Sequence, residues 1–141
     1  MSLKVAVAGA TGFVGRHLLE KIKKDFDVTA LSRSSSSIDG DITWVSVDLF
    51  SFRSTVDALK DIDIAIYLVH SMLPSTRLFQ GNFQDTDLLL ADNFAKACID
   101  RGVKQIIYLG GLIPTGKISP HLQSRQEVED VFNSSGIPCT I

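Results

Sequence analysis

The stretch that most restricts the fold is "VAVAGATGFVGRHL" at residues 5–18, where three glycines at a spacing of three join an apolar run to a helical pattern. In such a strand–turn–helix, Gly9 permits a tight turn, Gly12 lets the backbone approach a pyrophosphate, and Gly15 lets the helix pack closely on the strand. The free N–H groups of the first helical turn then face the phosphates. The pattern predicts a dinucleotide-binding turn, and a glycine turn that serves only packing is the alternative.

The rest of the chain alternates apolar, β-type runs with amphipathic helical patterns. This alternation predicts right-handed crossovers and a parallel sheet with helices on both faces. We therefore expect an α/β, doubly wound Rossmann fold of strand order 3-2-1-4-5-6, truncated in its sixth strand. The expected strands are 3–8, 27–33, 42–48, 62–70, 103–111 and 136–141, the expected helices are 12–24, 51–60, 84–101 and 119–134, and a polar turn at 34–41 and a loop at 71–83 complete the chain.

Composition limits the class of protein. The chain has 141 residues, 45% hydrophobic and 21% charged, with a net charge of −2, which suits one soluble domain and gives no reason to expect nucleic acid or a membrane as a partner. Cys98 and Cys139 form neither a disulfide framework nor a metal cluster, so we expect reduced thiols in a cytoplasmic protein and no metal site. We expect residues 1–141 to be one NAD(P)-binding domain whose C-terminal substrate region is absent from this chain.

The segment "AGATGFVG" resembles the TGxxGxxG fingerprint of the short-chain dehydrogenase/reductase superfamily, in particular its atypical NmrA-like and epimerase-like members. The resemblance covers essentially the whole chain. It implies an NAD(P)-binding Rossmann domain, and we expect Thr11, Phe13 and Val14 of this turn to contact the cofactor. Arg16, in the first helical turn, is a second candidate for the phosphates, with a solvated helix-face cation as the alternative.

The end of the second expected strand bears on the choice of cofactor. NAD-specific sites place an acidic residue there, whereas a nearby arginine suits the 2′-phosphate of NADP. This chain has Ser32 and Arg33, with no carboxylate at either position. We therefore expect NADP(H), with NAD(H) as the alternative. Arg33 could instead be a solvated loop cation.

Two further strand ends provide candidate contacts. By resemblance, Asp48 and Leu49 match an Asp-Leu pair that contacts the adenine, although an N-cap aspartate and a core leucine are equally consistent. Leu68, Val69 and His70 end the fourth expected strand and should border the cofactor ribose, because ligands bind at the carboxyl ends of such strands. His70 could also be satisfied by a neighbouring loop.

Catalytic members of the superfamily carry a serine or threonine after the fifth strand and a Tyr-x-x-x-Lys motif on the next helix. Here Gly110 and Gly111 stand where the serine is expected, and Tyr108 lies inside the strand, where we expect it in the core. His121-x-x-x-Arg125 occupies the place of Tyr-x-x-x-Lys.

Spacing decides which way that helix faces. Ser119 and Pro120 suit its N-cap and first position. His121, Arg125, Val128 and Phe132 then share one face. The two apolar anchors predict that His121 and Arg125 point toward the cofactor, with Arg125 as a contact and His121 as a candidate acid or base; a surface pair is the alternative.

These residues leave enzymatic activity undecided. The first hypothesis is the NAD(P)-binding domain of a reductase, epimerase or isomerase-like protein acting on an unknown small molecule. The second is a non-catalytic NADP(H) sensor or scaffold of NmrA-like type, favoured by the missing serine and tyrosine. A methyltransferase-like fold fits the glycine spacing poorly. Nothing in the sequence fixes the substrate or the oligomeric state.

Overall fold

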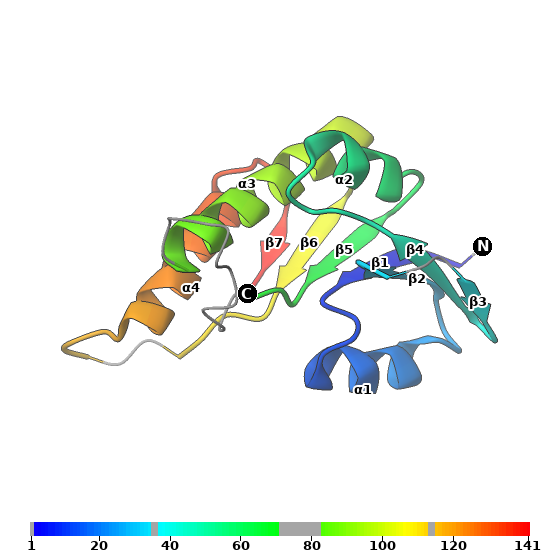
Figure 1. Ribbon diagram of the computed structural model, residues 1–141, viewed down its shortest axis with the longest axis horizontal. Coiled ribbons are helices and arrows are strands. Elements are labelled where there is room, and N and C mark those ends of the chain that lie inside the picture. The colour runs from blue at the N-terminus through cyan, green and yellow to red at the C-terminus, as the bar shows by residue number, and fades with distance from the viewer. Residues whose placement is uncertain (1, 35–36, 71–82, 113–114) are drawn as a thin grey trace.

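A seven-stranded sheet in the order β3-β4-β2-β1-β5-β6-β7 forms the centre of the computed structural model, which describes residues 2–34, 37–70, 83–112 and 115–141 (Figure 1). Six of the strands are parallel, so the predicted order 3-2-1-4-5-6 and the Rossmann-like fold are confirmed. The loop expected at 71–83 lies outside the described residues, apart from its last residue. The strands are β1 (Lys4–Ala8), β2 (Asp27–Ser32), β3 (Ser37–Asp39), β4 (Ile42–Ser46), β5 (Ile64–Tyr67), β6 (Gln105–Tyr108) and β7 (Cys139–Thr140), and the helices are α1 (Phe13–Ile22), α2 (Phe52–Ala58), α3 (Phe83–Arg101) and α4 (Pro120–Asn133).

The strand β3 was not expected. It lies antiparallel to β4 at the edge of the sheet, with Ser37 opposite Trp44 and Asp39 opposite Ile42. The two strands are joined by a tight turn at Gly40, whose φ of +57° is one that glycine adopts readily. The segment predicted as a polar turn therefore contains a short hairpin strand.

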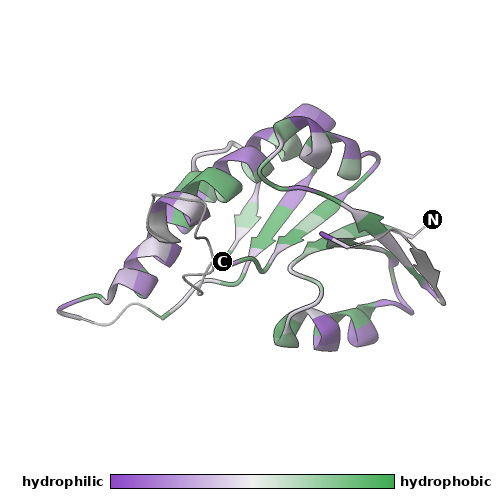
Figure 2. Cartoon of the chain, viewed as in Figure 1, coloured by the Kyte–Doolittle hydropathy of each residue, from purple (hydrophilic) through white to green (hydrophobic). Residues whose placement is uncertain are grey.

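The two faces of the sheet are covered unequally. Figure 1 shows α1 alone on one face and α2, α3 and α4 on the other. The larger core cluster lies on the three-helix face and contains the packed rings of Tyr67, Phe94, Tyr108 and Phe132. Figure 2 shows that the central strands are mostly apolar, whereas hydrophilic and hydrophobic residues alternate along the helices.

The α1 face remains open over β5, β6 and β7 in the part of the chain that the structure describes. A groove of about 470 Å³ lies there between α1 and the sheet. Its lining is almost entirely apolar and includes Leu109 and Ile141, which are 50% and 48% exposed. Because parallel sheets are normally covered on both faces, this groove is a surface that another segment could cover.

Helix positions follow the sequence pattern with one exception. Ser119 caps α4 by accepting a hydrogen bond from the Leu122 N–H at 3.2 Å, and Pro120 takes the first turn, as predicted. Leu88 of α3 falls near the spacing of the buried Ala91, Ala95 and Cys98 but is 37% exposed. The buried side of α3 includes Asp87 instead.

Candidate functional site

The glycine turn between β1 and α1 is tightly constrained at two of its three glycines. Gly9 has φ +84°, and a Cβ atom there would lie 2.9 Å from the carbonyl carbon of Leu68. A Cβ atom on Gly15 would lie 2.3 Å from the Gly9 carbonyl oxygen and 2.8 Å from Cα of Ala10. The turn therefore packs directly against the end of β5 and against the first turn of α1, and neither position has room for a side chain.

Gly12 differs from the other two glycines. Its backbone is extended, with φ −74° and ψ 175°, and a Cβ atom there would meet only the Gly9 oxygen, at 3.5 Å. Glycine is thus not required at this position for protein packing. The space above Gly12 is instead a cradle that a Cβ atom would fill, and this fits a site for a pyrophosphate.

The N-terminus of α1 completes this cradle. Its N-cap, Gly12, has no side chain to accept a hydrogen bond, and no acidic residue lies in the first turn. By contrast, α2 and α4 are capped by serine side chains. The exposed N–H groups and the positive end of the helix dipole fit an anionic group, and Arg16 is exposed one turn into the helix.

The carboxyl end of β2 lies beside that of β4. Ser32 is buried, and its hydroxyl lies 2.8 Å from that of Ser34, while the Ser34 N–H donates to Ser32 Oγ at 3.1 Å. Arg33 between them is exposed and makes no ion pair within the described residues. This guanidinium is available to an anionic group at the edge of the site.

The segment after β4 forms a hydrogen-bonded turn. Asp48 is exposed, and its Oδ1 accepts from the Phe50 N–H at 3.0 Å, while its own N–H donates to Ser54 Oγ at 3.0 Å. Leu49 is half-buried against the core. Asp48 is not the N-cap of α2, because that position belongs to Ser51.

A polar cluster lies where β5 and β6 end. His70 is half-buried, and its ring centroid lies 5.7 Å from that of Tyr108. Arg125 of α4 reaches over Gly111, and its Cδ would lie 3.4 Å from a Cβ atom placed on that glycine. The same Cβ atom would lie 2.6 Å from Cδ2 of Leu122, so the side chains of α4 occupy the space that a serine at position 111 would need.

Tyr108 is 1% exposed, so its predicted place in the core is confirmed. Burial raises the pKa of its phenol, while the nearby Arg125 acts in the opposite direction. The phenol therefore remains protonated at neutral pH. It cannot take the part of the ionising tyrosine found in catalytic members of the superfamily.

Two residues of this region were missed by the sequence interpretation. Asp87 of α3 and Ser124 of α4 are 5% and 1% exposed, and Ser124 Oγ donates to Asp87 Oδ2 at 3.0 Å. Helical spacing could have found both. Asp87 is in phase with the buried side of α3, and Ser124 lies one turn before the buried Val128.

His121 and Arg125 are not equivalent in their surroundings. Arg125 is half-buried at the Gly111 contact, whereas His121 is exposed in the first turn of α4. Val128 and Phe132 are 1% and 0% exposed, so their prediction as anchors of this face is confirmed.

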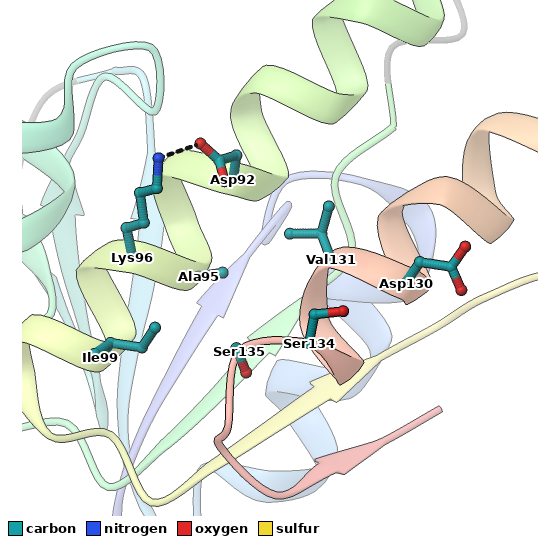
Figure 3. A pocket seen from close by; sticks show the side chains of 8 residues that line it. All are labelled: Asp92, Ala95, Lys96, Ile99, Asp130, Val131, Ser134 and Ser135. Carbon is teal, nitrogen blue, oxygen red and sulfur yellow. Dashed lines mark ion pairs between the residues drawn. The ribbon is translucent and has the colours of Figure 1, made fainter.

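A second hollow, of about 400 Å³, lies between α3 and α4 (Figure 3). Its lining comes from the second halves of both helices and includes Ala95, Ile99 and Val131. The ion pair between Lys96 and Asp92, at 2.8 Å, lies along its side. None of the predicted site residues lines it.

Two further observations concern the residues that the structure describes. They contain no group of three or more histidine, cysteine, aspartate or glutamate side chains that could hold a metal ion. No helix among them has both the length and the apolar character needed to cross a bilayer.

The chain is similar to several known proteins. The family model described as NAD(P)H-binding matches residues 9–141. Auxiliary protein GraX of Staphylococcus aureus (strain NCTC 8325 / PS 47) is 34% identical over 114 residues, which cover 79% of this chain and 37% of GraX. The N-acetyl-alpha-D-glucosaminyl-diphospho-ditrans,octacis-undecaprenol 4-epimerase of Escherichia coli O157:H7 is 29% identical over 140 residues, covering 96% of this chain and 40% of the epimerase.

Solved structures share the fold. UDP-N-acetylglucosamine 4-epimerase from Bacillus cereus superimposes with a TM-score of 0.75 at 25% identity, covering 98% of this chain and 52% of the epimerase chain. The Bordetella bronchiseptica enzyme WbmH in complex with NAD+ superimposes with a TM-score of 0.77 at 17% identity, covering 99% of this chain and 55% of WbmH. The chain thus spans about half the length of these two structures, and less of the two sequence relatives.

Proposed function

The chain belongs to the NAD(P)H-binding family and is an NAD(P)-binding domain of the epimerase/dehydratase-like kind, and from that premise we propose that its own cofactor is NADP(H). The observation that carries cofactor binding is the cradle above Gly12. It combines an open backbone position with an uncapped helix N-terminus and two flanking glycines that packing requires. When bound, the nicotinamide of such a cofactor supplies hydride donation and acceptance.

We propose that the cofactor lies along the carboxyl ends of the strands, from the glycine turn toward Arg125. The turn would hold the pyrophosphate, with Thr11, Phe13, Val14 and Arg16 beside it. The remaining predicted contacts support this path because each one follows a carboxyl strand end or lies above one: Ser32, Arg33, Asp48, Leu49, Leu68, Val69, His70 and Arg125.

The preference for NADP(H) rests on Arg33. Its guanidinium is exposed beside the hydroxyl pair of Ser32 and Ser34, and it can donate two parallel hydrogen bonds to a 2′-phosphate. No carboxylate stands at the end of β2 to accept from a free 2′-hydroxyl. WbmH was solved with NAD+, so relatives of this fold accept the dinucleotide without that phosphate.

Calorimetric titration of the purified chain with NADPH and NADH tests the preference. Charge-assisted hydrogen bonds of about 1.5–3 kcal/mol correspond to a preference of roughly 10- to 150-fold for NADPH. Arg33→Ala should remove this preference and leave the NADH affinity unchanged. Lys60→Ala deletes an exposed cation at the opposite edge of the sheet and is the matched control. Equal affinities of the unmodified chain for both dinucleotides would contradict the role of Arg33. Absence of binding by either would contradict cofactor binding itself.

We further propose that residues 1–141 form the dinucleotide-binding domain of a longer cytoplasmic protein. Two observations support the domain assignment. The relatives are about twice as long or longer, and the apolar groove beside Leu109 and Ile141 is a surface that a further segment would cover. The free thiols of Cys98 and Cys139 support the reducing compartment.

A second candidate function is a non-catalytic NADP(H) sensor or scaffold. The packing of Leu122 and Arg125 over Gly111 favours it, because a serine at position 111 would have to displace the end of the Leu122 side chain. The name of GraX, an auxiliary protein, fits this candidate as well. If the protein is instead an enzyme, His121 is the proposed acid or base, and His121→Ala should abolish turnover of an identified substrate while dinucleotide affinity stays constant.

A further inference from the structure

One buried polar atom lacks a hydrogen-bond partner in the part of the chain that the structure describes: Nδ1 of His70. His70 is the third residue after Tyr67, the last residue of β5. Buried polar atoms are nearly always paired in folded proteins, because an unpaired one costs free energy. At the carboxyl edge of a doubly wound sheet, a bound ligand would supply the missing hydrogen-bond partner.

The backbone of Leu109 lies within hydrogen-bonding reach of the imidazole and favours the protonated ring. A bond with that effect is one in which a ring N–H donates to the carbonyl oxygen. Because Nδ1 is unpaired, the donor is Nε2. In a neutral imidazole the second nitrogen is then a lone-pair acceptor, so this bond fixes Nδ1 as an acceptor.

The charges around His70 keep the ring neutral. Burial is the main cause that lowers its pKa, and the guanidinium of Arg125 lowers it further. The Leu109 carbonyl and the carboxylate of Asp87 act in the opposite direction without reversing the shift. The groups that face the ring thus come from β6, α3 and α4, with the phenol of Tyr108 as its ring neighbour. At neutral pH Nδ1 therefore remains unprotonated.

The position of His70 ties it to the glycine turn. Leu68, two residues earlier, contacts Gly9 closely and donates its N–H to the Ala8 carbonyl at 2.9 Å. The end of β5 is therefore held directly beside the cradle for the pyrophosphate. His70, two residues after Leu68, therefore lies on the same edge of the sheet as that cradle.

We propose that Nδ1 of His70 is a ligand-binding atom that accepts a hydrogen bond from a hydroxyl group of the bound molecule. This inference rests on the proposed dinucleotide binding. A neutral acceptor selects a donor, so phosphate and carboxylate groups are excluded as its partner, while sugar hydroxyls fit. The hydroxyl could belong to the ribose of the dinucleotide or to a second, hydroxylated ligand such as a nucleotide sugar. The adjacent Arg125 would then bind an anionic or carbonyl oxygen of the same ligand.

Nitrogen-15 NMR of histidine-labelled protein tests the tautomer first. The chain has three histidines, so His70→Phe assigns the signal and keeps an aromatic ring against Tyr108. At pH 7 the free protein should show His70 with Nε2 protonated and Nδ1 unprotonated. A proton on Nδ1, in either the other tautomer or the imidazolium, would overturn the inference. The unmodified protein decides this point even if the variant does not fold.

Ligand addition then identifies the source of the hydroxyl. NADPH is added alone in the first arm and together with UDP-N-acetylglucosamine in the second, with dinucleotide binding measured separately by calorimetry. A shift of the Nδ1 signal in the first arm, with affinity about tenfold weaker in His70→Phe, assigns the ribose. A shift only in the second arm assigns the second ligand. His17→Phe, which replaces the exposed histidine of α1, should change neither quantity.

The failures are distinguishable. If calorimetry shows that NADPH binds and the Nδ1 signal stays unchanged in both arms, the role of His70 is wrong and the proposed function stands. If NADPH and NADH both fail to bind, the proposed function is wrong, and the ligand role of His70 falls with it.

Discussion

Substitution of Gly12 by alanine separates the packing role of the glycine turn from its binding role. The structure leaves room for the added methyl group, because its nearest neighbour would be the Gly9 carbonyl oxygen at 3.5 Å. The backbone of Gly12, at φ −74° and ψ 175°, is extended and open to any residue. Gly12→Ala should therefore fold normally and bind the cofactor more weakly.

The effect on stability follows from two opposing contributions. Alanine is a poorer N-cap than glycine, which costs about 0.5–1 kcal/mol. Alanine also restricts the unfolded chain, which stabilises the folded state by about 0.4–1 kcal/mol where the backbone is compatible. The two nearly cancel, so the free energy of unfolding should change by less than about 1 kcal/mol. For a domain of this size the melting temperature should move by no more than about 4 °C.

The effect on binding has a different origin. The methyl group would occupy the cradle that a pyrophosphate must enter, and forcing one extra methyl into a filled site costs about 1–3 kcal/mol. The dissociation constant for NADPH should then rise roughly 5- to 150-fold. This loss affects only the complex with NADPH, because no atom of the free protein clashes with the added methyl group.

Calorimetric titration with NADPH and thermal unfolding by circular dichroism measure the two quantities. Gly15→Ala is the control with the opposite signature, because its methyl group would meet backbone atoms of Gly9 and Ala10 that cannot rotate away. It should destabilise the free protein by about 1–3 kcal/mol or more. Unchanged NADPH affinity in Gly12→Ala would refute the placement of the pyrophosphate over this turn.

Two further predictions concern stability. Ser124→Ala removes the buried hydrogen bond to Asp87 and should lower the free energy of unfolding by about 1–3 kcal/mol in urea titrations, whereas Ser135→Ala, at a half-buried position just after α4, serves as a comparison. The pKa of Asp63 lies below its ordinary value of 3.8, because the Lys4 backbone N–H donates to its carboxylate and Lys104 lies beside it. Because the folded pKa is the lower one, this stabilisation is present above pH 3.8 and disappears as the pH falls through the folded pKa. The stability difference between the unmodified protein and Asp63→Asn, from urea titrations at a series of pH values, should shrink over that range; a difference that does not vary would contradict the carboxylate's role.

The parallel sheet and its order were predictable because each strand is an apolar run between helical patterns. The edge strand β3 was not predicted because its residues, Ser37–Asp39, are mostly polar. A signal was nevertheless present, since the dipeptide Gly40–Asp41 between short strand-forming segments is typical of a two-residue hairpin loop. An edge strand needs only one hydrogen-bonded neighbour and no buried face, so apolar patterning cannot reveal it.

Only part of the candidate site could be predicted from the sequence. Glycine spacing indicated the turn, because Gly9 has a positive φ that favours glycine and a Cβ atom on Gly15 would have no space. Helical periodicity gave the direction of His121 around the helix axis, which is the direction of Val128. It could not give the position along that axis: α4 begins well beyond the carboxyl end of β6 (Figure 1), and His121 in its first turn is exposed. The unpaired Nδ1 of His70 depends on side chains from three elements and has no signature in the local sequence.

The region around Gly111 explains why the site departs from its superfamily. The space above this glycine is filled by Leu122 and Arg125, both from the first half of α4. A serine side chain at position 111 would first have to displace Leu122. The glycine at this position and the α4 side chains above it therefore belong to one packing arrangement, which differs from that of the catalytic members. In that arrangement the imidazole of His70 packs beside the ring of Tyr108, and the positive charge of Arg125 lowers the pKa of the imidazole. A ligand at this edge would therefore meet a neutral imidazole and a fixed cation instead of an ionising phenol.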